Sequence, residues 1–63
     1  MNIDFEISKI LAEGKYTPSE IHDFLQDRGY KIDLHKLTNY LNMQIALGRV
    51  SKDENGTFTS RLY

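Results

Sequence analysis

The chain has 63 residues, a formal net charge of −1 and no cysteine, and 40% of its residues are hydrophobic. This length provides one small domain, and the lack of cysteine excludes disulfides and thiolate zinc sites. No apolar run approaches the length of a membrane span, and the first residues lack the basic and apolar regions of a signal peptide, so we expect a soluble cytoplasmic protein.

Charge is distributed unevenly along the chain. Residues 1–30 carry three cations and six anions, whereas residues 31–63 carry five cations and three anions. Residues 34–52 contain no acid at all. Such an asymmetry indicates a surface that faces a polyanion, provided that the fold gathers these residues on one side.

The first predicted helix covers about residues 4–13. Its apolar residues recur at helical spacing and form one face, made of Ile3, Ile7, Ile10 and Leu11. Asn2 or Asp4 can cap its beginning. Gly14 is expected to end it in the left-handed conformation that glycine tolerates.

The second predicted helix covers residues 18–28 and has the clearest local signal. Thr17-Pro18-Ser19-Glu20 reads as a capping box with proline at the first helical position. Gly29 is expected to end the helix, with Tyr30 packed on Leu25 in a Schellman motif. The predicted buried stripe is Ile21, Phe24 and Leu25.

The third predicted helix follows Asp33, a suitable N-cap, and covers about residues 34–47, with Gly48 directly after it. At 100° per residue, one narrow face gathers Leu34, Leu37, Leu41 and Ile45, which we expect in the core. The opposite side is polar and basic.

The tail, about residues 49–62, has the pattern of a β-hairpin around Asn55-Gly56. A two-residue loop would place Val50 on a different face from Phe58 and Leu62. A three-residue loop over residues 54–56, with a bulge at Gly56, places all three on one face, and we prefer it for that reason. The same register puts the stem of Lys52 over Phe58.

This order of elements resembles the winged helix-turn-helix family. The resemblance is carried by Thr17-Pro18-Ser19-Glu20-Ile21, by Leu37 to Leu41, and by Gly48-Arg49-Val50 leading into a hairpin with Gly56-Thr57-Phe58. It implies an α+β, mainly helical fold, with three helices and a C-terminal β-hairpin wing in a single domain over residues 1–63. These motifs are specific for the architecture and not for any subfamily.

The resemblance implies that the third helix enters the major groove of double-stranded DNA. Its outer face would consist of His35, Lys36, Asn39, Asn42 and Met43. Asparagine can pair with adenine and lysine with guanine or phosphate. The wing would add Arg49, Lys52, Asn55 and Arg61 as contacts to the DNA backbone. Protection of an edge strand would explain the charged wing residues equally well.

Two further groups of residues are open to a second interpretation. A stripe made of Tyr40, Met43 and Leu47 lies beside the main core face of the third helix. It either packs on the first helix or the hairpin, or it forms a partner or homodimer surface. The acids of the first two helices are expected to form a solvated back face: Glu6, Glu13, Glu20, Asp23 and Asp27.

No pattern indicates an enzyme. His22 and His35 lie on different helices without a ligand at the next helical turn, so we expect surface histidines, no metal site and no cofactor. No serine lies in a nucleophile-elbow context, and no glycine-rich phosphate loop is present.

Two functions of different classes therefore remain. The first is a small DNA-binding transcriptional regulator of prokaryotic or phage type, which would gain specificity as a dimer. The alternative is a winged-helix module that binds a protein, such as a phage-encoded inhibitor or adaptor, and does not bind DNA. An exposed Tyr40/Met43/Leu47 stripe favours a protein partner, and a positive third-helix face favours DNA.

Overall fold

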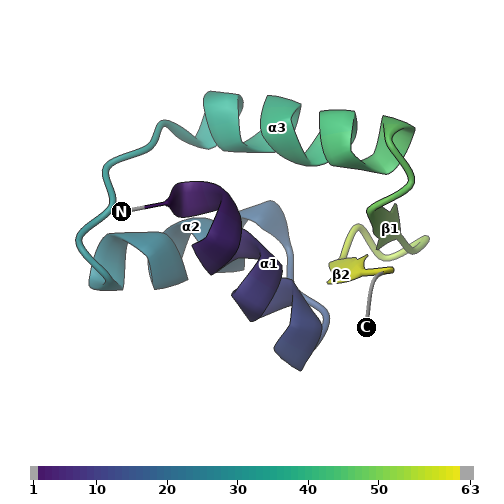
Figure 1. Ribbon diagram of the computed structural model, residues 1–63, viewed down its shortest axis with the longest axis horizontal. Helices are drawn as coiled ribbons and strands as arrows, with labels where there is room; N and C mark the ends of the chain where they lie inside the picture. The colour runs from purple at the N-terminus through teal and green to yellow at the C-terminus, as the bar shows by residue number, and fades with distance from the viewer. Residues whose placement is uncertain (1, 62–63) are drawn as a thin grey trace.

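A computed structural model describes residues 2–61, which form three helices and then an antiparallel hairpin (Figure 1). The helices are α1 (Ile3–Glu13), α2 (Pro18–Asp27) and α3 (Leu34–Ala46), and the strands are β1 (Val50–Lys52) and β2 (Phe58–Ser60). In Figure 1, α3 runs along one side of the molecule, α1 and α2 lie on the other, and the hairpin lies at one end of α3. The predicted α+β fold is confirmed, and its topology is consistent with a winged helix. Within these residues, no helix is long and apolar enough to cross a membrane.

The beginning of α1 follows the prediction, whereas its end does not. Asn2 caps the helix, because its side-chain oxygen accepts hydrogen bonds from the N–H groups of Asp4 (3.0 Å) and Phe5 (3.4 Å). The left-handed conformation predicted for Gly14 is wrong, since its backbone is extended. A Cβ at Gly14 would lie 3.2 Å from the Tyr16 hydroxyl oxygen. The absence of a Cβ at Gly14 therefore leaves room for the Tyr16 ring.

The hydrogen bonds predicted for both ends of α2 are present. The Glu20 N–H donates to Thr17 Oγ1 (3.2 Å) and the Thr17 N–H donates to Glu20 Oε1 (2.9 Å), so the capping box is complete. At the other end, the Tyr30 N–H donates to the Leu25 carbonyl (2.9 Å), as in a Schellman motif. The helix ends at Asp27, one residue earlier than predicted.

The end of α3 also agrees with the sequence, but its buried face is rotated. Gly48 adopts the left-handed conformation (φ 76°), and the Arg49 N–H donates to the Gln44 carbonyl (3.0 Å). Leu37 is fully buried as predicted, as is Leu41. Leu34 was expected in the core and is 43% exposed, whereas Gln44 is only 8% exposed. The core face of α3, which packs on α2 and β1, thus includes Gln44 and excludes Leu34.

The hairpin has the register that the three-residue loop predicts. Val50 pairs with Ser60 and Lys52 with Phe58, so Val50 and Phe58 share the buried face. Gly56 closes the turn with positive φ, and its N–H donates to the Asp53 carbonyl (3.1 Å). Leu62, which was predicted to join this face, lies outside the described residues.

The segment between α1 and α2 joins the free edge of the hairpin. Tyr16 and Phe58 form an antiparallel bridge, in which the Phe58 N–H donates to the Tyr16 carbonyl (2.7 Å) and the Tyr16 N–H donates to the Phe58 carbonyl (3.0 Å). The Tyr16 ring packs edge-on against Phe24 on α2, with 5.0 Å between the ring centroids. One residue thus ties the hairpin to the helices.

The core lies between the helices and the hairpin and consists of Ile7, Ile10, Leu11, Ile21, Leu25, Leu37, Leu41, Val50 and Phe58. Behind it, Arg28, directly after α2, pairs with the half-buried Glu6 on α1 (Nε to Oε2, 3.3 Å). Glu20 belongs to the capping box. Glu20 is exposed as predicted, whereas Glu6 is half-buried and paired, so the prediction of a solvated back face is wrong for Glu6 alone among the five predicted acids.

Candidate nucleic-acid interface

The outer face of α3 is open to solvent. All five side chains predicted to lie there are exposed: His35, Lys36, Asn39, Asn42 and Met43. They lie opposite Leu37 and Leu41, whose complete burial fixes the rotation of the helix about its axis. The burial of the opposite side of α3 thus leaves these five side chains open to solvent.

The electrostatic character of this face is weakly positive. Helix α3 has no acid, and Lys36 is its single lysine or arginine. Asp33 lies just before the helix, makes no side-chain capping hydrogen bond and is exposed. A polyanion would therefore meet amide groups, an imidazole and one ammonium along α3, with one carboxylate at its beginning.

The exposed face has a polar and an apolar edge. At 100° per residue, His35, Asn39 and Asn42 lie toward one edge. Met43 and Leu47 lie toward the other edge, with Lys36 between them, and the two apolar side chains are 59% and 57% exposed. These two side chains are the exposed part of the predicted apolar stripe.

Tyr40, the third member of that stripe, has a different environment. It is half-buried and its side chain faces α1. Burial raises the pKa of Tyr40 to about 12, and the hydrogen bond with Asp4 and the negative charge of that residue add to the effect. Tyr40 therefore keeps its proton at neutral pH and links α3 to α1, so the stripe does not form one continuous surface.

Lys52, Arg61 and Asn55, three of the predicted wing residues, are exposed on or beside the hairpin. The ammonium of Lys52 lies 5.6 Å from the centre of the Phe58 ring, as the register predicts. Arg61 is exposed beyond the end of β2, and its N–H donates to the Arg49 carbonyl (2.9 Å). Asn55 is exposed at the tip, and its N–H donates to Asp53 Oδ1 (3.0 Å).

Asp53 organises the hairpin loop through its carboxylate. Its Oδ2 accepts a hydrogen bond from the Thr57 hydroxyl (2.7 Å), and its Oδ1 accepts from the N–H groups of Thr57 (3.0 Å) and Asn55 (3.0 Å). The Thr57 hydroxyl is the main cause that lowers the pKa of Asp53, and the two N–H groups and the charge of Lys15 lower it further. This role of Asp53 was not predicted from the sequence.

Asp53→Asn is expected to lower the melting temperature at neutral pH. A lowered pKa in the folded state means that the carboxylate stabilises the fold above its unfolded pKa of about 4, and that this stabilisation is lost as pH falls through the folded pKa. The difference between the wild type and the variant should therefore shrink on acidification. Thermal unfolding followed by circular dichroism at several pH values measures it.

Glu54→Gln provides the matched control for this prediction, because Glu54 is the exposed neighbouring acid in the same loop. It should leave the melting temperature almost unchanged at every pH. An Asp53→Asn variant as stable as the wild type at neutral pH would contradict the role of the carboxylate in the loop.

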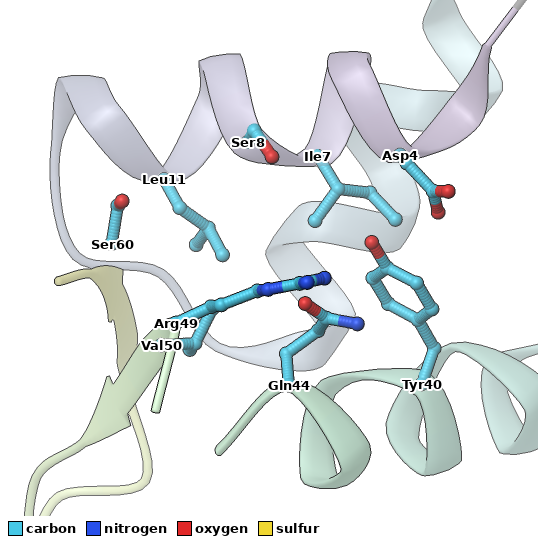
Figure 2. Close-up of a pocket in the computed structure, with 9 residues that line it drawn as sticks. All are labelled: Asp4, Ile7, Ser8, Leu11, Tyr40, Gln44, Arg49, Val50 and Ser60. Carbon is cyan, nitrogen blue, oxygen red and sulfur yellow. The ribbon is translucent and has the colours of Figure 1, made fainter. Parts of the chain in front are cut away.

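Arg49 does not extend along the hairpin. Its side chain is directed into a cavity of about 220 Å³ between α1, α3 and the hairpin (Figure 2). The cavity is lined by Asp4, Ile7, Ser8, Leu11, Tyr40, Gln44, Arg49, Val50 and Ser60. The Arg49 side chain thus lines this cavity, while the residue remains exposed and its carbonyl is bonded to the Arg61 N–H.

The two histidines have different roles. His35 is exposed, as predicted. His22 is half-buried and its Nε2 donates to the Ile32 carbonyl (2.8 Å), so the prediction of a surface histidine is wrong for it. This bond holds the link between α2 and α3. Across residues 2–61, no three His, Cys, Asp or Glu side chains gather in a way that could hold a metal ion.

Comparison with protein-family models, with curated proteins and with solved structures found no match. The similarity to winged helices accordingly rests on topology: three helices, a C-terminal hairpin, and the Tyr16–Phe58 bridge that joins the first interhelical segment to that hairpin.

Proposed function

We propose that the protein binds double-stranded DNA through the exposed face of α3 and acts as a small transcriptional regulator of prokaryotic or phage type. One observation carries the proposal: the exposed face of α3 combines amide, imidazole and ammonium groups and contains no carboxylate. A helix that enters a major groove passes between two rows of phosphates, so an acid on this face would oppose binding.

The base contacts are assigned to Lys36, Asn39 and Asn42. Residues three apart on a helix are neighbours on its surface, so these three side chains form a continuous row. Asparagine can bind the N6 and N7 edge of adenine with two hydrogen bonds, and lysine can bind guanine O6 and N7. The 13 residues of α3 span roughly 20 Å, which is enough to cross the groove.

Backbone contacts are assigned to Lys52 and Arg61, with Asn55 at the hairpin tip. Two exposed cations supply few phosphate contacts, so one protomer should bind weakly and with a shallow dependence on salt. A two-fold dimer that reads two half-sites would supply the missing affinity and specificity. Arg49 is not included in this surface, because it is directed into the cavity.

Charge reversal on α3 tests the proposal. Lys36→Glu should weaken binding to a mixed-sequence duplex roughly tenfold at low salt, because it removes one contact and places a carboxylate against DNA. Lys9→Glu, on the outer face of α1, changes the net charge by the same amount and should have little effect. Fluorescence anisotropy of a labelled duplex measures both affinities. Equal losses in the two variants would mean that net charge alone governs binding.

A second function is favoured by the exposure of Met43 and Leu47, since exposed apolar side chains grouped on one helix are typical of protein-binding surfaces. In that case α3 would dock on a protein through its apolar edge and would not bind DNA. DNA binding that is lost in Lys36→Glu and kept in Lys9→Glu would contradict this second function, because a module that binds only protein would not bind DNA.

A further inference from the structure

The cavity between α1, α3 and the hairpin has a cation in its lining, the guanidinium of Arg49. Within residues 2–61, the guanidinium of Arg49 makes no ion pair and no hydrogen bond. Figure 2 shows it extended along the cavity toward Gln44 and Tyr40. Arg49 is exposed, so this cation lies in a concave site that solvent and a small anionic ligand can reach.

The other groups around the cavity divide into an apolar base and a polar rim. Ile7, Leu11 and Val50 are buried and supply the apolar base. Ser8 and the nearly buried Gln44 supply polar groups close to Arg49 (Figure 2). The acid in the lining, Asp4, interacts with the Tyr40 hydroxyl and forms no ion pair with Arg49.

The size of the cavity restricts the ligand. A volume of about 220 Å³ corresponds to roughly seven water molecules at the density of the liquid. This is below the usual range for drug-sized ligands and suits a molecule of fewer than about ten non-hydrogen atoms.

We propose that this cavity binds a small carboxylate with a short aliphatic body, whose carboxylate pairs with Arg49 and whose aliphatic part packs on Ile7, Leu11 and Val50. Both a simple fatty acid and an α-amino acid have this chemistry. The proposal is independent of DNA binding, because none of these residues belongs to the exposed face of α3. Arg49 is exposed and forms no ion pair within the described residues, so its replacement should change stability little.

Three probes with one carbon skeleton test the proposal: 4-methylpentanoate, its primary amide and leucine. Each is titrated to about 20 mM into labelled protein at constant ionic strength and followed by amide NMR shifts, since the expected Kd is on the order of 1 mM. The acid should cause saturable shifts at Ser8, Gln44 and Arg49, and the uncharged amide should bind at least about tenfold more weakly. Leucine identifies the source: tighter binding than that of the acid indicates an amino acid, and weaker binding indicates a simple acid.

Two variants complete the test. Arg49→Gln should weaken binding of the acid roughly tenfold, because it removes the charge-assisted hydrogen bonds. Arg61→Gln removes an exposed arginine of the same hairpin region and should bind the acid as the wild type does. The absence of saturable shifts with both the acid and leucine, or equal binding of the acid by Arg49→Gln and the wild type, would overturn the proposal.

Discussion

Phe58→Ala is expected to abolish cooperative folding or to lower the melting temperature by at least about 15 °C. The Phe58 side chain is 2% exposed and belongs to the core. Truncation of a buried phenylalanine costs about 3–5 kcal/mol, and each kcal/mol shifts the melting temperature of a domain of this size by roughly 4–8 °C.

The position of Phe58 in the fold explains why so large an effect is expected. Its backbone bonds to Tyr16, its neighbour across the hairpin is Lys52, and its ring packs in the core. The total stability of a chain of this length is roughly 3–9 kcal/mol, so the loss of one such side chain removes most of it.

Phe5→Ala is the matched control, because Phe5 is an aromatic side chain on α1 that is 64% exposed. Its truncation should change stability by no more than about 0.5 kcal/mol. Urea and thermal unfolding, followed by circular dichroism, measure both variants. A Phe58→Ala protein that unfolds cooperatively within a few degrees of the wild type would contradict the core described above.

The double variant Asn39→Ala/Asn42→Ala is expected to reduce specific DNA binding at least about thirtyfold and to leave non-specific binding unchanged. Each bidentate contact to a base contributes about 1–3 kcal/mol of discrimination, whereas non-specific binding depends on phosphate contacts. Both side chains are exposed, and alanine favours the helix, so the melting temperature should be equal to that of the wild type or slightly higher.

The duplex for this measurement is the sequence that the wild-type protein enriches from a random pool. Gln26→Ala serves as control, because Gln26 is an exposed amide on α2, away from the proposed surface. Anisotropy titrations with the enriched and a scrambled duplex give the specificity ratio of each protein. A double variant that keeps the wild-type ratio would exclude Asn39 and Asn42 as base contacts.

The parts of the fold that could be predicted from the sequence depend on local physical chemistry. The capping box at Thr17 and Glu20 involves residues three apart, and the hydrogen bonds after Gly48 involve a single turn of chain. The hairpin register follows from the two faces of a strand and the need to bury Phe58. These features were confirmed because distant residues do not enter into them.

The features that the sequence did not predict depend on tertiary packing. The periodicity of α3 is equally compatible with several rotations, and the packing of α3 on α2 and β1 decides that Gln44 is buried and Leu34 exposed. The conformation of Gly14 is set by the Tyr16 ring two residues later, and the position of that ring depends on Phe24.

The same distinction applies to the candidate site. The exposed residues of α3 could be recognised by their position opposite Leu37 and Leu41. The cavity at Arg49 could not be recognised, because its lining comes from both ends of the chain. One local signal was available for Asp53, since an aspartate that begins a hairpin loop often accepts hydrogen bonds from the next residues.

The most direct test of DNA binding by α3 is an amide-shift NMR titration of the labelled protein with a mixed-sequence duplex, at roughly 50 mM salt and again at moderate salt. The proposal predicts shifts confined to residues 34–43 and to the hairpin at 52–61, which weaken as salt increases. Unchanged spectra at low salt, or shifts centred on α1 and α2, would contradict it and would direct the search to a protein partner for Met43 and Leu47.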